Sequence, residues 1–314
     1  MTAPVTMRPN GASETGAAYC NGASETGAVY CVVTAAGSGT RLGFNQPKAL
    51  VPVAGVPMVV RAVTGMFAHP QVVAVVVTAP AEQLPQFDEL FANDSRVRVA
   101  PGGRERQDSV SAGLLALEQF ARELGQPMGP DSPVLIHDAA RPLTPLAVVN
   151  AVVDNLRAGL PAVIPALPVT DTIKVVPQTP VAGEPLETAP RAQVMEPQTP
   201  VAGEPLETAP RAQVMEPQTL VAGQPVEPVV GAVDRAVLRG VQTPQGFHWG
   251  IIQRAHGLPG AGEQTQPPPL AVTDDAALVE SLGEPVYLCA GSELSMKVTT
   301  AFDLEVIDFL AARS

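Results

Sequence analysis

Short apolar runs alternate with amphipathic segments along most of this 314-residue chain. The apolar runs predict buried strands at 32–34, 72–78, 97–99, 134–136, 162–166 and 172–176. Apolar residues at helical spacing predict helices at 57–67, 82–91, 109–124 and 146–156. Because strands and helices alternate, we expect an α/β fold with a doubly wound, mostly parallel, Rossmann-like sheet.

The same alternation returns near the C-terminus. Strands are expected at 236–241, 285–289 and 296–298, and helices at 251–256, 274–282 and 301–312. Residues 242–247 are expected to form a turn or loop because they combine proline, glycine and polar side chains. The strands at 172–176 and 236–241 would then form the base of a protruding β-hairpin arm that spans 172–242.

A proline-rich repeat interrupts the pattern at about 177–230. Residues 178–197 recur identically at 198–217, and a decayed third copy begins at Gln218. Each unit contains four prolines and few large apolar residues, so it cannot bury a face as a solenoid repeat must. We therefore expect a flexible insertion within the arm.

The N-terminal residues 1–28 are rich in glycine, alanine, serine and threonine, which predicts a disordered tail. They contain a duplication in which residues 10–20 recur at 21–31 with one change. Only the second copy continues into a strand, so the first copy is redundant for folding. The remaining residues, 29–314, are expected to form a single domain.

Charge and cysteine content narrow the possible partners. The formal net charge is -12, which argues against nucleic-acid binding because that function needs a basic face. The longest apolar runs are far too short to span a bilayer, and the N-terminus does not resemble a signal peptide. Three sparse cysteines, without metal-ligand spacing, favour a reducing compartment, so a cytoplasmic location is expected.

A loop of small residues follows the first strand and is the strongest indication of chemistry. It comprises Ala35, Ala36, Gly37, Ser38 and Gly39, and the cations Arg41 and Lys48 stand just beyond it. Small residues let the backbone approach a ligand, so that loop N–H groups can contact phosphate oxygens. The two cations could neutralise a triphosphate. A glycine-rich turn beside surface cations is the alternative.

Two common nucleotide loops do not fit this stretch. A dinucleotide fingerprint needs an acidic residue about 20 positions on, whereas no Asp or Glu occurs between Thr26 and Ala81. A Walker loop needs Lys and Ser or Thr after its last glycine, whereas Phe44 follows Gly43. The pattern Ala-Gly-x-Gly-x-Arg-Leu followed by Pro-Lys instead resembles the signature of nucleotidyltransferases.

Two further motifs suggest ligand contacts. Gly102 and Gly103 precede a predicted helix start, where Asp108 or Ser109 could also be simple caps. Asp138 follows a buried strand at the sheet edge where open α/β folds bind ligands, and a carboxylate there suits Mg²⁺ beside phosphates. An ion pair between Asp138 and Arg141 is the alternative, and His137 is expected to be a packed residue.

Taken together, the motifs resemble 2-C-methyl-D-erythritol 4-phosphate cytidylyltransferases of the non-mevalonate isoprenoid pathway. The motifs occur in the order Ala35–Arg41, Pro47-Lys48, Gly102–Val110, His137–Pro142, Asp171–Lys174, Thr243–Gln245, Thr273–Asp275 and Met296–Thr299. The resemblance covers about 29–176 and 231–312 and excludes the tail and the repeats. It implies transfer of the cytidylyl group of CTP to methylerythritol phosphate, with release of pyrophosphate.

The resemblance also implies roles for individual residues. The implied catalytic cations are Arg41, Lys48 and Lys297, and the implied metal ligand is Asp138, which would hold Mg²⁺ or another hard divalent cation. The implied CTP-binding residues are Ala35, Ala36, Gly37, Gly39, Gly103, Arg106, Ser109 and Ala139. The implied substrate-binding residues are Arg141, Thr172, Arg235 and Thr243. Glu293 is a candidate for a second metal-associated acid.

Arg235 bears on the assembly of the protein. In the family this arginine reaches the active site of the partner subunit, which implies a homodimer with crossed arms. The alternative for Arg235 is a solvated hairpin cation, since the adjacent insertion could shift the register. Three other functions remain open from sequence: a cytidylyltransferase for another polyol phosphate such as ribitol 5-phosphate, an inert nucleotide-binding protein, and a scaffold built on the repeats.

Overall fold

The structure is a computed structural model that describes residues 27–37, 46–176, 219–220, 224–225, 229–260 and 274–313. Almost all of the expected tail, both identical repeats, and the predicted site residues Gly39 and Arg41 lie outside the described residues. The chain divides into two units, residues 1–167 with 241–314 and residues 168–240, and each is described by itself.

The first unit is built on a mixed, largely parallel sheet. Its strands are β1 (Val29–Thr34), β4 (Val72–Ala79), β5 (Val97–Pro101), β6 (Pro133–Asp138), β7 (Ala162–Pro168), β13 (Gln245–His248) and β14 (Tyr287–Ala290). They pair in the order β7-β13-β6-β1-β4-β5, and β14 pairs with β7. Strands β5, β4, β1 and β6 run parallel, which confirms the predicted α/β class.

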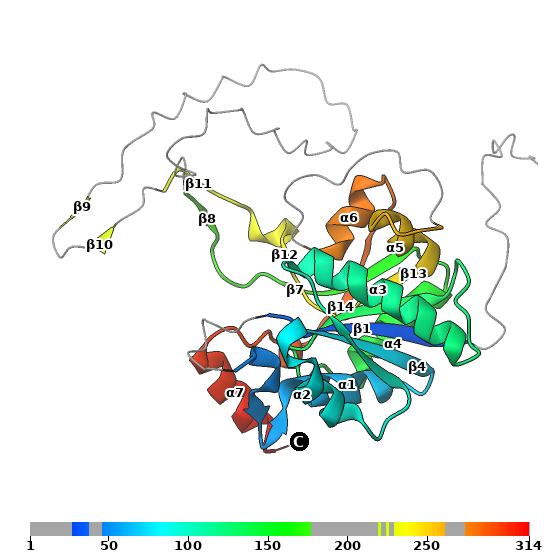
Figure 1. The fold of residues 1–314 in the computed structure, drawn as a ribbon. Coiled ribbons are helices and arrows are strands. Elements are labelled where there is room, and N and C mark those ends of the chain that lie inside the picture. Colours follow the sequence, from blue (N-terminus) through cyan, green and yellow to red (C-terminus); the bar gives the residue numbers. More distant parts are fainter. Residues whose placement is uncertain are drawn as a thin grey trace, which may run out of the picture. The chain divides into compact units, whose positions relative to one another are not determined.

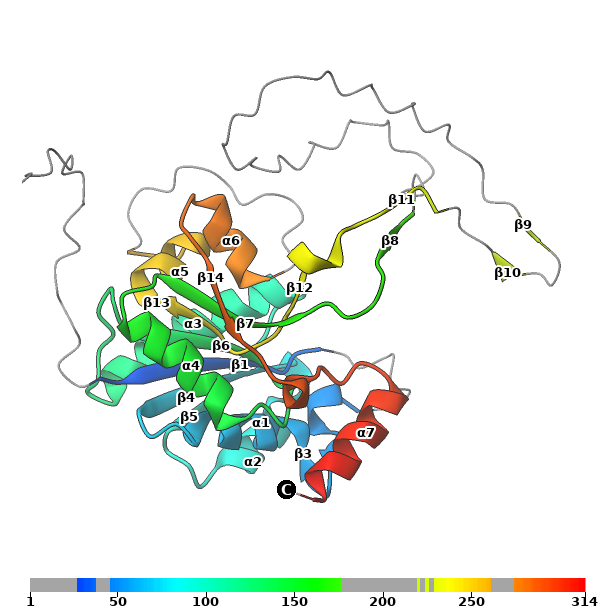
Figure 2. The ribbon, with the colours of Figure 1, turned by 180° about the vertical axis from the view of Figure 1, so that it is seen from behind.

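Helices cover both faces of this sheet (Figures 1 and 2). One face carries α1 (Met58–Phe67), α2 (Leu84–Phe91) and α4 (Leu146–Arg157), and the other carries α3 (Arg106–Glu123), α5 (Trp249–Ala255) and α6 (Asp275–Ser281). Each group packs its own apolar core against the alternate side chains of the strands. The helical periodicity in the sequence therefore identified these layers correctly.

Strand β13 was predicted to be a turn or loop, and that prediction was wrong. Residues 245–248 insert antiparallel between β6 and β7 and are largely buried. Gly246 is required there, because a Cβ atom would lie 2.3 Å from a methyl carbon of Val152. Of the residues that suggested a turn, Gly246 thus belongs to a tightly packed central strand, and Pro244 precedes that strand.

A smaller apolar cluster joins the C-terminal helix to a short hairpin. The hairpin strands are β2 (Pro52–Val53) and β3 (Val56–Pro57), and the helix is α7 (Ala301–Ala311). The expected strand at 296–298 is absent from the described structure. This segment is an irregular stretch in which the Val298 N–H donates to the Ala140 carbonyl, while the Val298 side chain is buried. Single-turn 3-10 helices occur at Lys48–Leu50, Ala81–Gln83 and Glu293–Ser295.

The second unit contains short strands near the expected arm. They are β8 (Lys174–Val175), β9 (Thr219–Leu220), β10 (Gln224–Pro225), β11 (Gly231–Ala232) and β12 (Arg239–Val241). β8 pairs antiparallel with β11, not with residues 236–241 as predicted. The reason is local: Asp234 caps a 3-10 turn at Arg235–Val237, which interrupts the expected strand. In the part of the chain that is described, no helix could cross a membrane.

Candidate functional site

The carboxyl ends of β1 and β6 create the candidate site. The two strands pair in parallel so that Thr34 and Asp138, their last residues, lie opposite each other. The Thr34 hydroxyl donates to the Asp138 carboxylate over 3.3 Å. This is the edge at which open α/β sheets bind ligands, as expected from the sequence.

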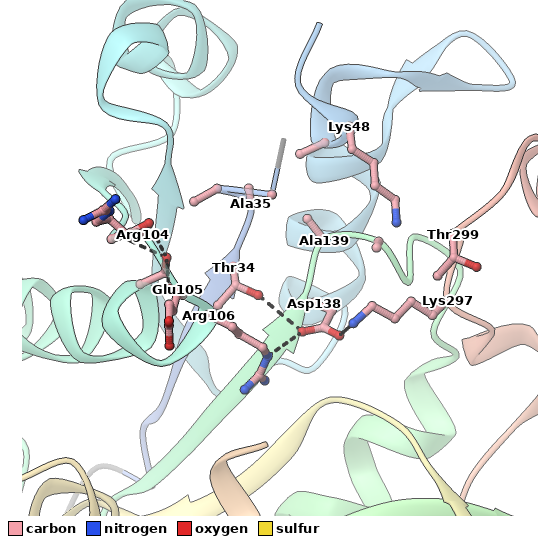
Figure 3. A pocket seen from close by; sticks show the side chains of 16 residues that line it. Thr34, Ala35, Lys48, Arg104, Glu105, Arg106, Asp138, Ala139, Lys297 and Thr299 are labelled. Atoms are coloured by element: carbon pink, nitrogen blue, oxygen red, sulfur yellow. Dashed lines mark hydrogen bonds and ion pairs between the residues drawn. The ribbon is translucent and has the colours of Figure 1, made fainter. Parts of the chain in front are cut away.

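A cavity of about 370 Å³ opens at this edge (Figure 3). It is lined by residues from the end of β1, the 3-10 turn before α1, the start of α3, the end of β6 and the segment before α7. The lining residues are Thr34, Ala35, Ala36, Gly37, Lys48, Ala49, Gly103, Arg104, Glu105, Arg106, Ser109, Asp138, Ala139, Ala140, Lys297 and Thr299. Segments far apart in the sequence therefore meet in one cavity.

Glycines allow two of these segments to approach each other closely. A Cβ atom on Gly102 would lie 2.5 Å from the Cβ of Ala36, so only glycine permits this contact between the two loops. The Ser109 hydroxyl accepts a hydrogen bond from the Gly103 N–H over 3.0 Å and donates to the Glu105 carbonyl over 3.0 Å. Ser109 therefore shapes the loop that forms one wall of the cavity.

Asp138 is surrounded by cations. Its carboxylate lies 2.8 Å from Lys297 Nζ, 3.4 Å from Arg106 Nε and 3.9 Å from Arg141 Nε. Burial alone would raise the pKa of this carboxyl, but the charges of Arg106, Lys297 and Arg141 outweigh burial and hold the pKa well below its usual range. Asp138 is therefore ionised at neutral pH. Its pairing with Arg141, considered above as an alternative, is one part of a larger cluster.

A buried hydrogen-bond chain supports Asp138 from behind. The His137 ring is fully buried, with Nε2 3.2 Å from the Arg141 carbonyl and Nδ1 2.9 Å from the Thr243 hydroxyl. A carbonyl only accepts, so Nε2 bears the proton and Thr243 donates to Nδ1. Thr243 in turn accepts from the Asp138 N–H over 3.1 Å. His137 is thus a packed residue, as predicted from the sequence.

Most residues predicted to bind CTP lie at the cavity. Ala35, Ala36, Gly37, Gly103, Arg106, Ser109 and Ala139 all line it, together with Lys48, Asp138 and Lys297. Figure 3 shows Lys48 and Lys297 entering from different segments, with Lys297 directed at Asp138. Glu293 is exposed in a 3-10 turn and does not line the cavity.

The residues predicted to bind the second substrate are more dispersed. Arg141 and Thr243 contact the Asp138 cluster without lining the cavity, and Arg141 also donates to the Ser295 carbonyl over 2.6 Å. Thr172 and Arg235 belong to the second unit, where Arg235 donates to the Thr170 carbonyl.

Sequence reasoning missed several lining residues, including Thr34, Arg104 and Thr299. Arg104 and Thr299 lay within quoted motifs and Thr34 ended the predicted strand directly before one, so their position beside assigned residues was the available signal. Asp275 was also missed as a functional candidate, because its motif, Thr273–Asp275, contributed to the resemblance without any role being assigned to this residue. It is 1% exposed and binds Arg106 Nη1 at 2.7 Å.

Most of the chain matches one family of known proteins. The family model for IspD, 2-C-methyl-D-erythritol 4-phosphate cytidylyltransferase, matches residues 29–208 and 208–313. The cytidylyltransferase of that name from Nocardia farcinica is 38% identical over 283 residues, which cover 90% of this chain and 93% of the relative. That from Streptomyces avermitilis is also 38% identical, covering 90% of this chain and 91% of the relative.

Solved structures agree with this result at the level of the fold. The 2-C-methyl-D-erythritol 4-phosphate cytidylyltransferase from Thermus thermophilus is 25% identical with a TM-score of 0.57, covering 91% of this chain and 99% of that chain. The 4-diphosphocytidyl-2C-methyl-D-erythritol synthase from Anaerococcus prevotii has a TM-score of 0.61 at 20% identity, covering 92% and 100%. The second likeness shows the fold alone.

Proposed function

This chain belongs to the 2-C-methyl-D-erythritol 4-phosphate cytidylyltransferase family, and we propose that the cavity at the ends of β1 and β6 is its active site. The enzyme acts on 2-C-methyl-D-erythritol 4-phosphate in the non-mevalonate isoprenoid pathway. The observation that carries the site assignment is the convergence of Lys48, Arg106, Asp138 and Lys297 on one cavity.

The reaction joins the phosphate of the acceptor to the α-phosphorus of CTP. An acceptor phosphate oxygen forms a bond to that phosphorus while the bond to the bridging oxygen breaks, and pyrophosphate leaves with the electron pair. Negative charge is spread over phosphate oxygens throughout, so catalysis depends on positioning and charge stabilisation. Lys48 and Lys297 supply that stabilisation in our assignment, and Arg41, outside the described residues, is proposed to assist them.

The base and phosphates of CTP are assigned to the walls of the cavity. The backbone of Ala35, Ala36, Gly37 and Gly39 would contact the triphosphate, because small side chains leave the N–H groups accessible. The loop at Gly103, with Arg106, Ser109 and the neighbouring Ala139, would frame the cytosine. The contact between Gly102 and Ala36 supports this division, since it holds the two walls together.

A magnesium ion fits the donor set if the nucleotide supplies most of its ligands. Among the described residues, no group of three or more His, Cys, Asp or Glu side chains could hold a metal. Mg²⁺ at phosphate sites needs only one or two carboxylates, and Asp138 is a buried, ionised carboxylate lining the cavity. When bound, the ion would neutralise charge on the phosphates, and Asp138 would hold it.

The acceptor phosphate is assigned to Arg141, Thr172 and Arg235, with Thr243 supporting Asp138 from behind. We propose that Arg235 acts in the site of a second subunit, so that the enzyme is a homodimer joined through the arm. Exposed valines of the second unit support an apolar contact there: Val229, Val230 and Val237 are 59%, 50% and 74% exposed.

The free thiols of Cys31 and Cys289 accord with the proposed cytoplasmic location.

Pyrophosphate release tests the function directly. The purified chain is supplied with Mg²⁺, methylerythritol phosphate and CTP, and parallel reactions contain ATP, GTP or UTP. We expect release with CTP alone, and ribitol 5-phosphate should replace the acceptor poorly. Equal release with all four nucleotides, or none with CTP, would refute the assignment. To test the site, Lys48→Ala should abolish most release while the protein remains folded by circular dichroism.

A further inference from the structure

A second polar network lies behind the proposed nucleotide site, between α3, α5 and α6. The Ser111 hydroxyl lies 2.8 Å from His256 Nδ1, and His256 Nε2 lies 3.1 Å from one oxygen of Asp275. The other Asp275 oxygen accepts from Arg106 Nη1 over 2.7 Å. The chain of contacts therefore runs from Ser111 through His256 and Asp275 to a residue that lines the cavity.

The buried carboxylate of Asp275 fixes which of its neighbours donate. The side chains of His256 and Asp275 are 0% and 1% exposed. A carboxylate only accepts, so His256 Nε2 bears a proton and donates to Asp275. Asp275 is therefore held on one side by His256 and on the other by Arg106, which leaves its carboxylate little freedom to rotate.

Arg106 lies between two carboxylates. Its Nη1 binds Asp275, and its Nε faces Asp138 at 3.4 Å. Burial lowers the pKa of this guanidinium, but Asp275 and Asp138 outweigh that effect and raise it. Without Asp275, Arg106 would lose its closer carboxylate partner and would interact more fully with Asp138, in competition with Lys297 and with the metal assigned to that carboxylate.

Hydrogen bonds from the central sheet hold the first turn of α6 in place. Gln245 on the central strand β13 donates to Asp274 over 2.8 Å, and its amide oxygen accepts from the Ala276 N–H over 3.3 Å. Asp274 also caps α6 by accepting from the Ala277 N–H. The first turn of α6, which presents Asp275, is thus anchored to the sheet that carries Asp138.

We propose that Asp275 and His256 are positioning residues that orient Arg106 and thereby set the affinity of the enzyme for CTP. The proposal rests on the proposed function of the cavity. Ser, His and Asp in this order resemble an acyl-transfer triad, but Ser111 does not line the cavity and the second Asp275 oxygen is used by Arg106. The network therefore serves the cavity through Arg106.

A double-mutant cycle tests whether Asp275 acts through Arg106. Asp275→Asn keeps the shape and removes the charge. We expect the KM and Kd for CTP to rise about 10-fold while kcat changes less than about 3-fold. In an Arg106→Gln background, the same substitution should change both values less than about 2-fold, because its target is gone. CTP binding is measured by calorimetry and turnover by pyrophosphate release.

The histidine offers a matched pair of variants in case Asp275→Asn fails to fold. Gln can place its amide nitrogen near Nε2 and keep the donor to Asp275, whereas Asn is too short. His256→Gln should stay within about 2-fold of the parent KM for CTP, and His256→Asn should raise it about 5-fold. Glu284→Gln is the control, since it removes the exposed ion pair of Arg254 on α5.

The outcomes separate this proposal from the proposed function. If the parent enzyme releases no pyrophosphate with CTP, the proposed function fails. If the parent is active and Asp275→Asn weakens CTP binding equally in both backgrounds, Asp275 does not act through Arg106 and the inference is wrong. An unchanged KM in folded Asp275→Asn, or equal effects of His256→Gln and His256→Asn, would also overturn it.

Discussion

At the residue scale, the site is a single buried carboxylate held among three cations. Asp138 accepts from Lys297, Arg106 and Thr34, so each cation is positioned before any phosphate arrives. The cluster of Asp138, Arg106, Arg141 and Lys297 carries three positive charges and one negative charge, and Asp275 balances one of the three by pairing with Arg106. The remaining positive charge favours a polyanionic ligand such as a nucleoside triphosphate.

Replacing Lys297 tests this arrangement. Lys297→Ala should lower kcat/KM on the order of 100-fold or more, because one preorganised cation is lost where phosphate charge develops. Lys297→Arg keeps the charge but changes the donor geometry and should lose less. Steady-state pyrophosphate release measures both. Arg122→Gln, which breaks an exposed pair with Glu118, is the control. Equal rates for Lys297→Ala and this control would remove Lys297 from the assigned site.

His137 makes a prediction about stability. Burial lowers its pKa to about 4, with the neighbouring Asp138 charge working against that shift. The unfolded chain takes up this proton near pH 6.5, so the folded state loses stability as the pH falls from about 6.5 toward 4. At pH 5 the expected loss is about 2 kcal/mol relative to pH 8.

Urea unfolding at pH 5 and pH 8 checks this expectation. His137→Gln should be less stable at pH 8, because its amide can replace the Nε2 donor to the Arg141 carbonyl but not the Nδ1 acceptor for Thr243. Its stability should nevertheless fall less between the two pH values, since the titrating ring is gone. If the parent and the variant lose the same free energy over this interval, His137 is not the group responsible.

The burial of His137 was predictable from its place directly after the apolar strand predicted at 134–136. The role of the Thr243 hydroxyl was not, because it depends on β13 lying beside β6, a pairing between residues more than a hundred positions apart. The role of Asp275 was not predictable for the same reason, because its ion-pair partner, Arg106, is on another helix. Local motifs identify which residues have suitable chemistry, while the pairing of distant segments determines which of those residues contact one another.

At the element scale, the sequence predicted strands and helices well where apolar periodicity was long. The helices at 58–67, 106–123, 146–157 and 301–311 agree with expectation within a few residues. The errors fall in short segments whose conformation is set by neighbours. Residues 245–248 are a strand because β6 and β7 flank them, whereas residues 296–298 are irregular and are held by a backbone hydrogen bond from Val298 to Ala140.

The hairpin of β2 and β3 offers a test of local strain. Its two-residue turn is Ala54-Gly55, and Ala54 has a φ of 45°. A left-handed alanine is unfavourable, whereas Asn-Gly is the preferred pair for such turns. Ala54→Asn should stabilise the fold by about 0.5–1 kcal/mol and raise Tm by about 2–3 °C.

The matched control is Ala54→Val, whose branched Cβ should make the left-handed conformation worse and lower Tm. Differential scanning calorimetry of the parent and both variants provides the measurement. Both should retain pyrophosphate release, since Ala54 does not line the cavity. A Tm that rises with Val, or falls with Asn, would show that packing against α7 outweighs backbone strain at this turn.

At the scale of the whole molecule, the arm links the proposed acceptor site to assembly. Arg235 and Thr172 lie in the unit formed by 168–240, whereas the proposed catalytic cations lie in the other unit. The sequence could not predict how β8 pairs, because two-residue strands have little pattern of their own. A role for Arg235 in trans therefore needs a measurement that reports on which subunit supplies it.

Complementation between inactive variants is that measurement. Lys48→Ala damages the cavity and leaves the arm intact, while Arg235→Ala does the reverse, and each homodimer should be nearly inactive. If Arg235 serves the partner's cavity, a heterodimer of the two has one intact site. Random exchange then makes half of the dimers mixed, and the pool should regain about one quarter of parental activity. If Arg235 served its own subunit, every site in the mixture would lack either Lys48 or Arg235, and exchange would restore nothing.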